Sequence, residues 1–182
     1  MAGALLFEKI IQLAQTDYSC QDDRDFPFIS LVSYPFAEML KGNIDANLLK
    51  FQMAECFQMF IDQGVSLAAI ACNTLHAFCP PIPPQIEFLH LIRETATHLE
   101  KEVTGDLLVL SSTTSKNNHL YNRCLYPKRD LQTKLDQMID RILGGSQLET
   151  ESRRLASWLN EYPTATIVLG CTEFSLLNER TP

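Results

Sequence analysis

The sequence lacks any stripe of lysine or arginine residues, and its net charge is −7. The basic pair Lys128–Arg129 is followed at once by Asp130. Because a nucleic-acid-binding surface needs clustered positive charge, this pattern argues against nucleic acid as a partner.

The chain also lacks a long hydrophobic run. Its N-terminus, MAGALLFEKI, has only a short apolar stretch before Glu8 and no basic residue ahead of it. A secretory signal peptide has a basic n-region, and a membrane span needs about 20 apolar residues. We therefore expect a cytoplasmic protein that has no membrane partner.

None of the cysteines forms a CxxC pair, and the four histidines show no metal-ligand spacing with them. The sequence therefore predicts neither a disulfide framework nor a metal site, and in a reducing cytosol the thiols are mostly free. Cys56 lies on an apolar helical face and is expected in the core. The six cysteines are Cys20, Cys56, Cys72, Cys79, Cys124 and Cys171.

Hydrophobic residues make up 46% of the chain, which permits a sizeable core, and several segments have helical periodicity. Residues 45–63 are an example, with Leu49, Met53 and Phe57 on one face. Asp45 is a suitable N-cap and Gly64 a suitable stop. The same periodicity predicts helices over residues 4–15, 130–143 and 150–161.

Short apolar runs without helical period lie between these helices and are typical of buried strands. Alternation of strands and helices indicates an α/β fold with parallel sheets. The proline-rich segment Cys79–Pro84 is a candidate boundary between two lobes, residues 1–88 and residues 89–182. The expected strands are Phe28–Val32, Leu67–Ala71, Leu107–Leu110 and Ala165–Leu169.

In each expected lobe an apolar strand is followed by a cysteine and then by residues that suit a helix start. The first lobe has Cys72-Asn73-Thr74, and the second has Cys171-Thr172-Glu173. Ligands of open α/β folds bind beyond the carboxyl ends of the strands. A helix start offers unpaired N–H groups for a carboxylate and lowers the pKa of a nearby thiol.

Two thiols facing one another across a cleft suit the inversion of a carbon centre, because one thiolate removes a proton and the opposite thiol returns one. Each residue also has a structural interpretation. A buried cysteine at a strand end is more often a small apolar side chain. His76 is either an acid/base partner of Cys72 or a structural histidine, and Glu173 either tunes Cys171 or favours the positive end of a helix.

The segments around both cysteines resemble the signatures of the aspartate/glutamate racemase family. Ala71–His76 is similar to the first, A-C-N-T-x-H, and Leu169–Leu177 to the second, G-C-T-E with a following pair of leucines. Ser33–Pro35 falls where the family often has S-N-P, and Leu110–Ser115 where it has a G-T-x-x-T loop that contacts the substrate.

This resemblance implies a two-lobed α/β fold with pseudo-twofold symmetry and a site in the cleft between the lobes. It implies racemisation of an amino acid with no cofactor, neither pyridoxal phosphate nor metal, and in many members a homodimer. Cys72 and Cys171 are then the catalytic residues, and His76 is an auxiliary one. The expected substrate-binding residues are Ser33, Asn73, Thr74, Ser112, Ser115, Thr172 and Glu173.

The sequence also departs from the family pattern, and a truncated form of the fold is expected. The family begins with a strand ahead of the first helix and continues through a strand and a helix after G-C-T-E, whereas this chain runs only from Met1 to Pro182. The loop after Ser33–Pro35 has no arginine, and Ser146 stands where a lysine is expected. In the family these two basic residues face an acidic substrate side chain.

Three functions remain open. The first is an amino-acid racemase that acts at a carbon alpha to a carboxylate. The second is an inactive homologue that kept the cleft and binds a small carboxylate. The third is a thiol-redox protein, in which Cys72 and Cys171 form a disulfide.

Overall fold

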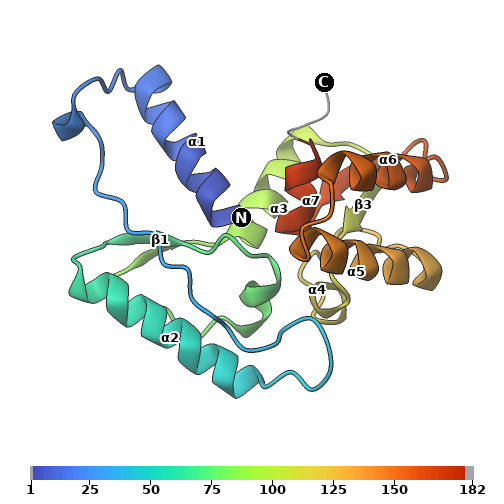
Figure 1. Cartoon of the computed structure of the whole chain (residues 1–182), viewed down its shortest axis with the longest axis horizontal. Helices are drawn as coiled ribbons and strands as arrows, with labels where there is room; N and C mark the ends of the chain where they lie inside the picture. Colours follow the sequence, from blue (N-terminus) through green and yellow to red (C-terminus); the bar gives the residue numbers. More distant parts are fainter. Residues whose placement is uncertain (1, 179–182) are drawn as a thin grey trace.

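The computed structural model describes residues 2–178, which fold into helices and four short strands (Figure 1). In chain order the elements are α1 (Ala2–Asp17), η1 (Asp23–Asp25), α2 (Ala46–Asp62), β1 (Leu67–Ala69), η2 (Thr74–Phe78), β2 (Glu87–Leu89), α3 (Leu91–Glu102), β3 (Leu107–Leu110), α4 (Thr113–Asn117), α5 (Arg129–Leu143), α6 (Leu148–Leu159), β4 (Thr166–Leu169) and α7 (Thr172–Asn178).

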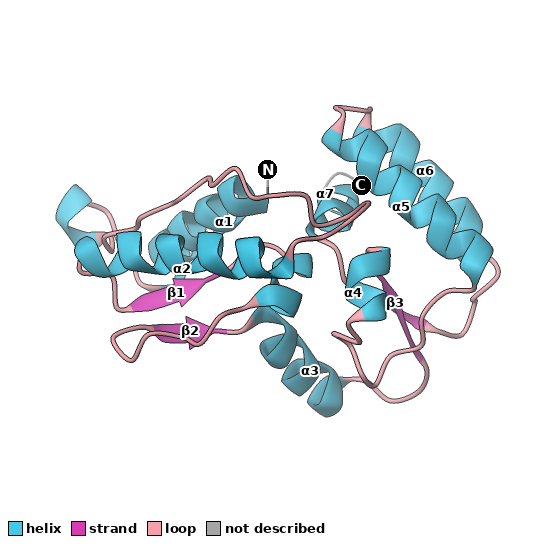
Figure 2. Ribbon diagram, turned by 90° about the horizontal axis from the view of Figure 1, so that it is seen from below, coloured by secondary structure: helices cyan, strands magenta, loops and turns pink. Residues whose placement is uncertain are grey.

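The strands form two small parallel sheets, each flanked by helices (Figure 2). In the first sheet β1 pairs with β2, so that Leu67 lies opposite Glu87. In the second sheet β3 pairs with β4, so that Leu110 lies opposite Leu169. The expected α/β class with parallel sheets is therefore confirmed.

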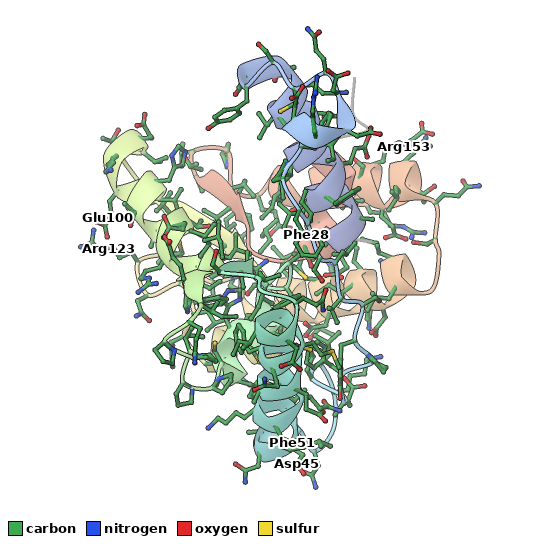
Figure 3. All side chains as sticks on the ribbon, turned by 90° about the vertical axis from the view of Figure 1, so that its left-hand side faces the viewer. Phe28, Asp45, Phe51, Glu100, Arg123 and Arg153 are labelled. Atoms are coloured by element: carbon green, nitrogen blue, oxygen red, sulfur yellow. The ribbon has the colours of Figure 1, made fainter. Side chains whose placement is uncertain are left out.

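Helix α2 forms as its sequence predicts. The Asp45 side chain caps it by accepting hydrogen bonds from the backbone N–H groups of Asn47 and Leu48, at 3.1 and 2.9 Å. Figure 3 shows Asp45 at the beginning of this helix. The chain leaves the helix through Gly64, whose φ of +73° is accessible to glycine without steric cost.

The largest core cluster lies between the β3–β4 sheet and helices α5, α6 and α7. Leu135, Met138 and Ile142 of α5 are buried in it, together with Phe174 of α7. An ion-pair group around the buried Glu151 carboxylate joins α5 to α6, because Arg141 binds both carboxylate oxygens of Glu151, at 3.0 and 2.9 Å. This packing fixes the helices that surround the end of β4.

One expected strand is absent and one strand was not expected. Phe28–Val32 forms no strand, and the side chains of Phe28 (labelled in Figure 3) and Leu31 are 73% and 57% exposed. Although this run is apolar, β1 pairs with Glu87–Leu89 instead. The strand Glu87-Phe88-Leu89 has only three residues, which is too short a pattern to be recognised.

Helix α1 contacts α7, so the first and last helices of the described residues pack together. The predicted boundary between residues 88 and 89 falls inside β2, and the division into lobes remains a prediction. Within residues 2–178 the structure contains no helix with the length and hydropathy needed to cross a membrane.

Candidate functional site

A pocket with a volume of about 310 Å³ lies beyond the carboxyl ends of strands from both sheets. The chain reaches it through Cys72, three residues after β1 ends, and through Cys171, two residues after β4 ends. The residues that line it are Phe36, Ala37, Glu38, Met39, Leu40, Cys72, Asn73, Thr74, Leu143, Cys171, Thr172 and Glu173.

Cys171 is paired with the carboxylate of Glu173. Its Sγ donates a hydrogen bond to Glu173 Oε2 over 2.9 Å, and Thr172 Oγ1 donates to the same oxygen over 3.2 Å. Burial raises the pKa of the Cys171 thiol well above its ordinary value, and the charge of Glu173 raises this pKa further. Cys171 is therefore held as a protonated thiol.

Cys72 has a different electrostatic environment. Burial raises the pKa of its thiol, but hydrogen bonds from the backbone at Leu75 and Thr74 act in the opposite direction on this pKa. Charge on the Cys72 sulfur also raises the pKa of Cys171. A thiolate at Cys72 therefore favours the protonated form of Cys171.

Asn73 is fixed from the second half of the chain. The Tyr121 hydroxyl donates a short hydrogen bond to Asn73 Oδ1, and both side chains are buried. Burial also raises the pKa of the Tyr121 hydroxyl, which keeps it protonated and able to donate. This contact orients the amide of Asn73 at the pocket wall.

The hydroxyl groups of Thr74, Ser112 and Ser115 form a buried triangle. The Oγ1 of Thr74 lies 3.0 Å from Ser112 Oγ and 3.2 Å from Ser115 Oγ, and the two serine hydroxyls are 3.0 Å apart. Ser112 also caps α4 by accepting a hydrogen bond from the Ser115 N–H, at 3.1 Å. Of the three, only Thr74 lines the pocket, and the serines lie behind it.

Two other predicted site residues lie outside the pocket lining. His76 is buried, and its Nδ1 is 2.8 Å from the Cys72 carbonyl oxygen. Its ring packs against His90 and Phe88, with ring centroids 4.6 and 5.9 Å away. Ser33 is exposed and is also not among the lining residues. His76 can therefore influence Cys72 through the backbone carbonyl of Cys72. Ser33 lies outside the pocket.

The pocket contains a wall that the sequence did not reveal. Phe36–Leu40 forms it, together with Leu143 from the last turn of α5. An ion pair holds this wall in place, because Lys41 Nζ lies 2.7 Å from Asp140 Oδ2 on α5. Figures 1 and 2 both show the segment ahead of α2 reaching towards α5. The sequence carries little signal for this wall, because Glu38 interrupts the apolar residues that follow Ser33–Pro35.

All six cysteines are free thiols, as the sequence predicts. Among residues 2–178 the structure brings together no group of three or more His, Cys, Asp or Glu side chains that could hold a metal ion. The reactive and polar groups that line the pocket are two thiols, two threonine hydroxyls, one amide and two carboxylates.

No family model and no curated protein matches the sequence significantly. Among solved structures, the chain is similar to glutamate racemase from Campylobacter jejuni subsp. jejuni, with 17% identity and a TM-score of 0.49. The match covers 75% of this chain and 59% of that chain, so this chain spans less than two thirds of that racemase. A likeness of this extent assigns neither a family nor an activity.

Proposed function

We propose that the chain is a cofactor-independent amino-acid racemase that inverts a carbon alpha to a carboxylate. The proposal rests mainly on one observation, that Cys72 and Cys171 line the same pocket although they follow strands of different sheets. The racemase-like segments around both cysteines agree with it. A small amino acid or related carboxylate is the ligand that the proposal requires.

In this mechanism Cys72 starts as the thiolate and Cys171 as the thiol. Cys72 takes the α-proton, and the electron pair of the broken C–H bond passes into the substrate carboxylate. Cys171 then gives its proton to the opposite face of the carbon. Since no electrons are gained or lost overall, the reaction needs no oxidant or reductant.

The difference between the two thiols supports these roles. Burial raises the pKa of Cys72, but two backbone hydrogen bonds, at Leu75 and Thr74, partly offset this, whereas Cys171 has one such bond, at Glu173. The Glu173 carboxylate accepts a hydrogen bond from the Cys171 thiol and opposes charge there. After one turnover Cys72 is the thiol and Cys171 is the thiolate. Glu173, the hydrogen-bond partner of Cys171, is positioned to exchange a proton with it.

The polar lining residues would hold the substrate. Tyr121 occupies the oxygen of the Asn73 amide, so the amide NH₂ group is the part that a substrate carboxylate would meet. Thr74 and Thr172 also line the pocket, but their hydroxyls already bond to the two serines and to Glu173. The Asn73 NH₂ group is a donor fixed before the substrate arrives, and such a donor stabilises the charge that develops on the carboxylate during proton removal.

A second function is favoured by one observation. Burial raises the pKa of both thiols, so thiolate is scarce at neutral pH. A protein with this pocket and too little thiolate would bind a small carboxylate without turning it over. Ligand-induced thermal stabilisation without α-proton exchange would identify this inactive homologue.

Two variants test the racemase proposal. Cys72→Ser and Cys171→Ser each remove one thiol, and we expect each to lower racemisation at least a thousandfold over a panel of amino acids. Cys20→Ser is the matched control, because Cys20 lies outside the pocket and donates to the Asp25 carbonyl, which serine can also do. Unchanged racemisation in both pocket variants would rule out the proposal.

The cytoplasmic location, the homodimer and the two-lobe division stay predictions within this proposal. Light scattering on the purified chain would determine the number of subunits. Limited proteolysis with cleavage near Cys79–Pro84 would support a boundary between lobes at that segment.

A further inference from the structure

Both charged side chains that line the pocket are acidic. They are Glu38 and Glu173, and the other lining residues are apolar or neutral and polar. Glu38 Oε1 accepts hydrogen bonds from the backbone N–H groups of Leu40 and Lys41, at 2.7 and 3.1 Å. These hydrogen bonds lower the pKa of Glu38, so its carboxylate is charged at neutral pH.

The basic residue next to this wall is directed elsewhere. Lys41 Nζ forms its ion pair with Asp140 on α5, and Lys41 is not among the lining residues. Its hydrogen bond to Asp140 raises the pKa of the Lys41 ammonium, which keeps Lys41 charged. Within the described lining, a second carboxylate on a substrate therefore has no cation to pair with.

The rest of the wall is apolar. Phe36, Met39 and Leu40 come from the loop ahead of α2, and Leu143 comes from the end of α5. Met39 and Phe36 pack against the core cluster of α2 and η2, and Leu40 packs against the cluster around α5. The side-chain end of the pocket is therefore a hydrophobic surface held from both halves of the chain.

We propose, building on the racemase function above, that the substrate is an amino acid with a single carboxylate and an apolar side chain. The α-carboxylate meets the Asn73 amide, whereas the side chain lies against Phe36, Met39 and Leu143. Aspartate and glutamate are disfavoured, because their second carboxylate would face the carboxylates of Glu38 and Glu173 with no cation in the lining.

Matched amino acids test this selectivity. Methionine, glutamine and glutamate have side chains of similar length and differ in polarity and charge. The α-proton exchange rate of each in D₂O gives kcat/KM, and we expect methionine to exceed glutamate at least a hundredfold and glutamine to exceed glutamate at least tenfold. Leucine, asparagine and aspartate repeat the comparison at a shorter length.

A variant links the selectivity to the pocket. Glu38→Gln keeps the oxygen that accepts from Leu40 and Lys41 but removes the charge. The ratio of kcat/KM for glutamine to kcat/KM for glutamate should therefore fall at least threefold. Glu102→Gln removes a charge at the exposed end of α3 and should leave the ratio unchanged. An unchanged ratio in Glu38→Gln would contradict the assignment.

The outcomes separate this inference from the racemase proposal. If the α-protons of glutamate or aspartate exchange as fast as those of the neutral amino acids, the inference is overturned and the racemase proposal still holds. If no amino acid exchanges, the racemase proposal fails, and thermal shift with methionine and glutamate then tests the pocket alone. Greater stabilisation by glutamate than by methionine would overturn the inference in that case.

Discussion

Cys72 and Cys171 lie in one pocket, although each follows a strand of a different sheet. β1 ends at Ala69 and β4 ends at Leu169, and the residues just after each strand turn into the pocket. Glu173 reaches both thiols electrostatically, since its charge raises the pKa of Cys72 and that of Cys171. The pKa values of the two thiols therefore depend on the same carboxylate.

Replacing Glu173 with glutamine should shift the pH dependence of activity. The Glu173 charge raises the pKa of both thiols, so its removal lowers both and moves the acidic limb of the kcat/KM profile to lower pH. A pH profile together with a titration of thiolate absorbance measures the shift. Glu102→Gln is the control, and an acidic limb at the same pH in Glu173→Gln would show that the carboxylate does not tune the thiols.

The folding stability should decrease at alkaline pH because of Cys171. Its folded pKa lies above the unfolded value of about 8.5, so the folded state binds more protons in that range. The stabilisation is complete below the unfolded pKa and is lost as pH rises towards the folded pKa. Chemical denaturation between neutral and alkaline pH should show a smaller decline in the free energy of unfolding for Cys171→Ser than for the wild type. An equal decline in the two proteins would contradict the role of the buried thiol.

Glu151→Gln should destabilise the fold by about 1 kcal/mol at neutral pH. Glu151 is only 1% exposed, but its partners Arg141 and Arg154 are 36% and 48% exposed, so water screens part of the charge that they are left with. Its hydrogen bond from Arg141 lowers the pKa of Glu151, so this stability is present above the unfolded pKa and is lost as pH falls.

Urea denaturation at several pH values measures this effect. The difference between Glu151→Gln and the wild type should shrink as the medium becomes acidic. Glu149→Gln is the control, because its pair with Arg153 is exposed and should contribute little. Equal effects of the two substitutions would contradict the account of this ion-pair group.

Gly170→Ala should destabilise the protein by about 2 kcal/mol through overpacking. A Cβ at Gly170 would lie 2.5 Å from Val109 Cγ2 and 3.1 Å from a Tyr121 ring carbon. Since Tyr121 orients Asn73, the substitution should also weaken substrate binding. Denaturation and KM measure the two effects. Gly3→Ala, whose Cβ would meet only a flexible leucine end, should be neutral, and the same outcome for Gly170→Ala would refute the predicted clash.

The sequence predicts those parts of the fold whose pattern is local. Asp45, the apolar face of α2 and Gly64 lie within one helix and define its bounds. The cysteines and the residues after them could also be located, because the end of an apolar strand is visible in the sequence. Phe28–Val32 was wrong as a strand, since an apolar run does not reveal whether a partner strand is present.

The pocket wall could not be predicted, because it depends on contacts between distant residues. Lys41 meets Asp140, and Tyr121 meets Asn73, only after both halves of the chain have folded. Leu143 lines the pocket because α5 ends there, which no local pattern indicates. Ser112 and Ser115 were expected to contact the substrate, but they lie behind Thr74, and their role remains a prediction.

The most direct test of the central claim is the position of deuterium after a single turnover in D₂O. With one enantiomer of methionine as substrate, two thiols on opposite faces of the carbon should place deuterium in the product enantiomer and leave the recovered substrate unlabelled. Mass spectrometry after chiral separation measures both pools. Deuterium in both enantiomers at equal rates would mean that a single group handles both faces, which contradicts the roles assigned to Cys72 and Cys171.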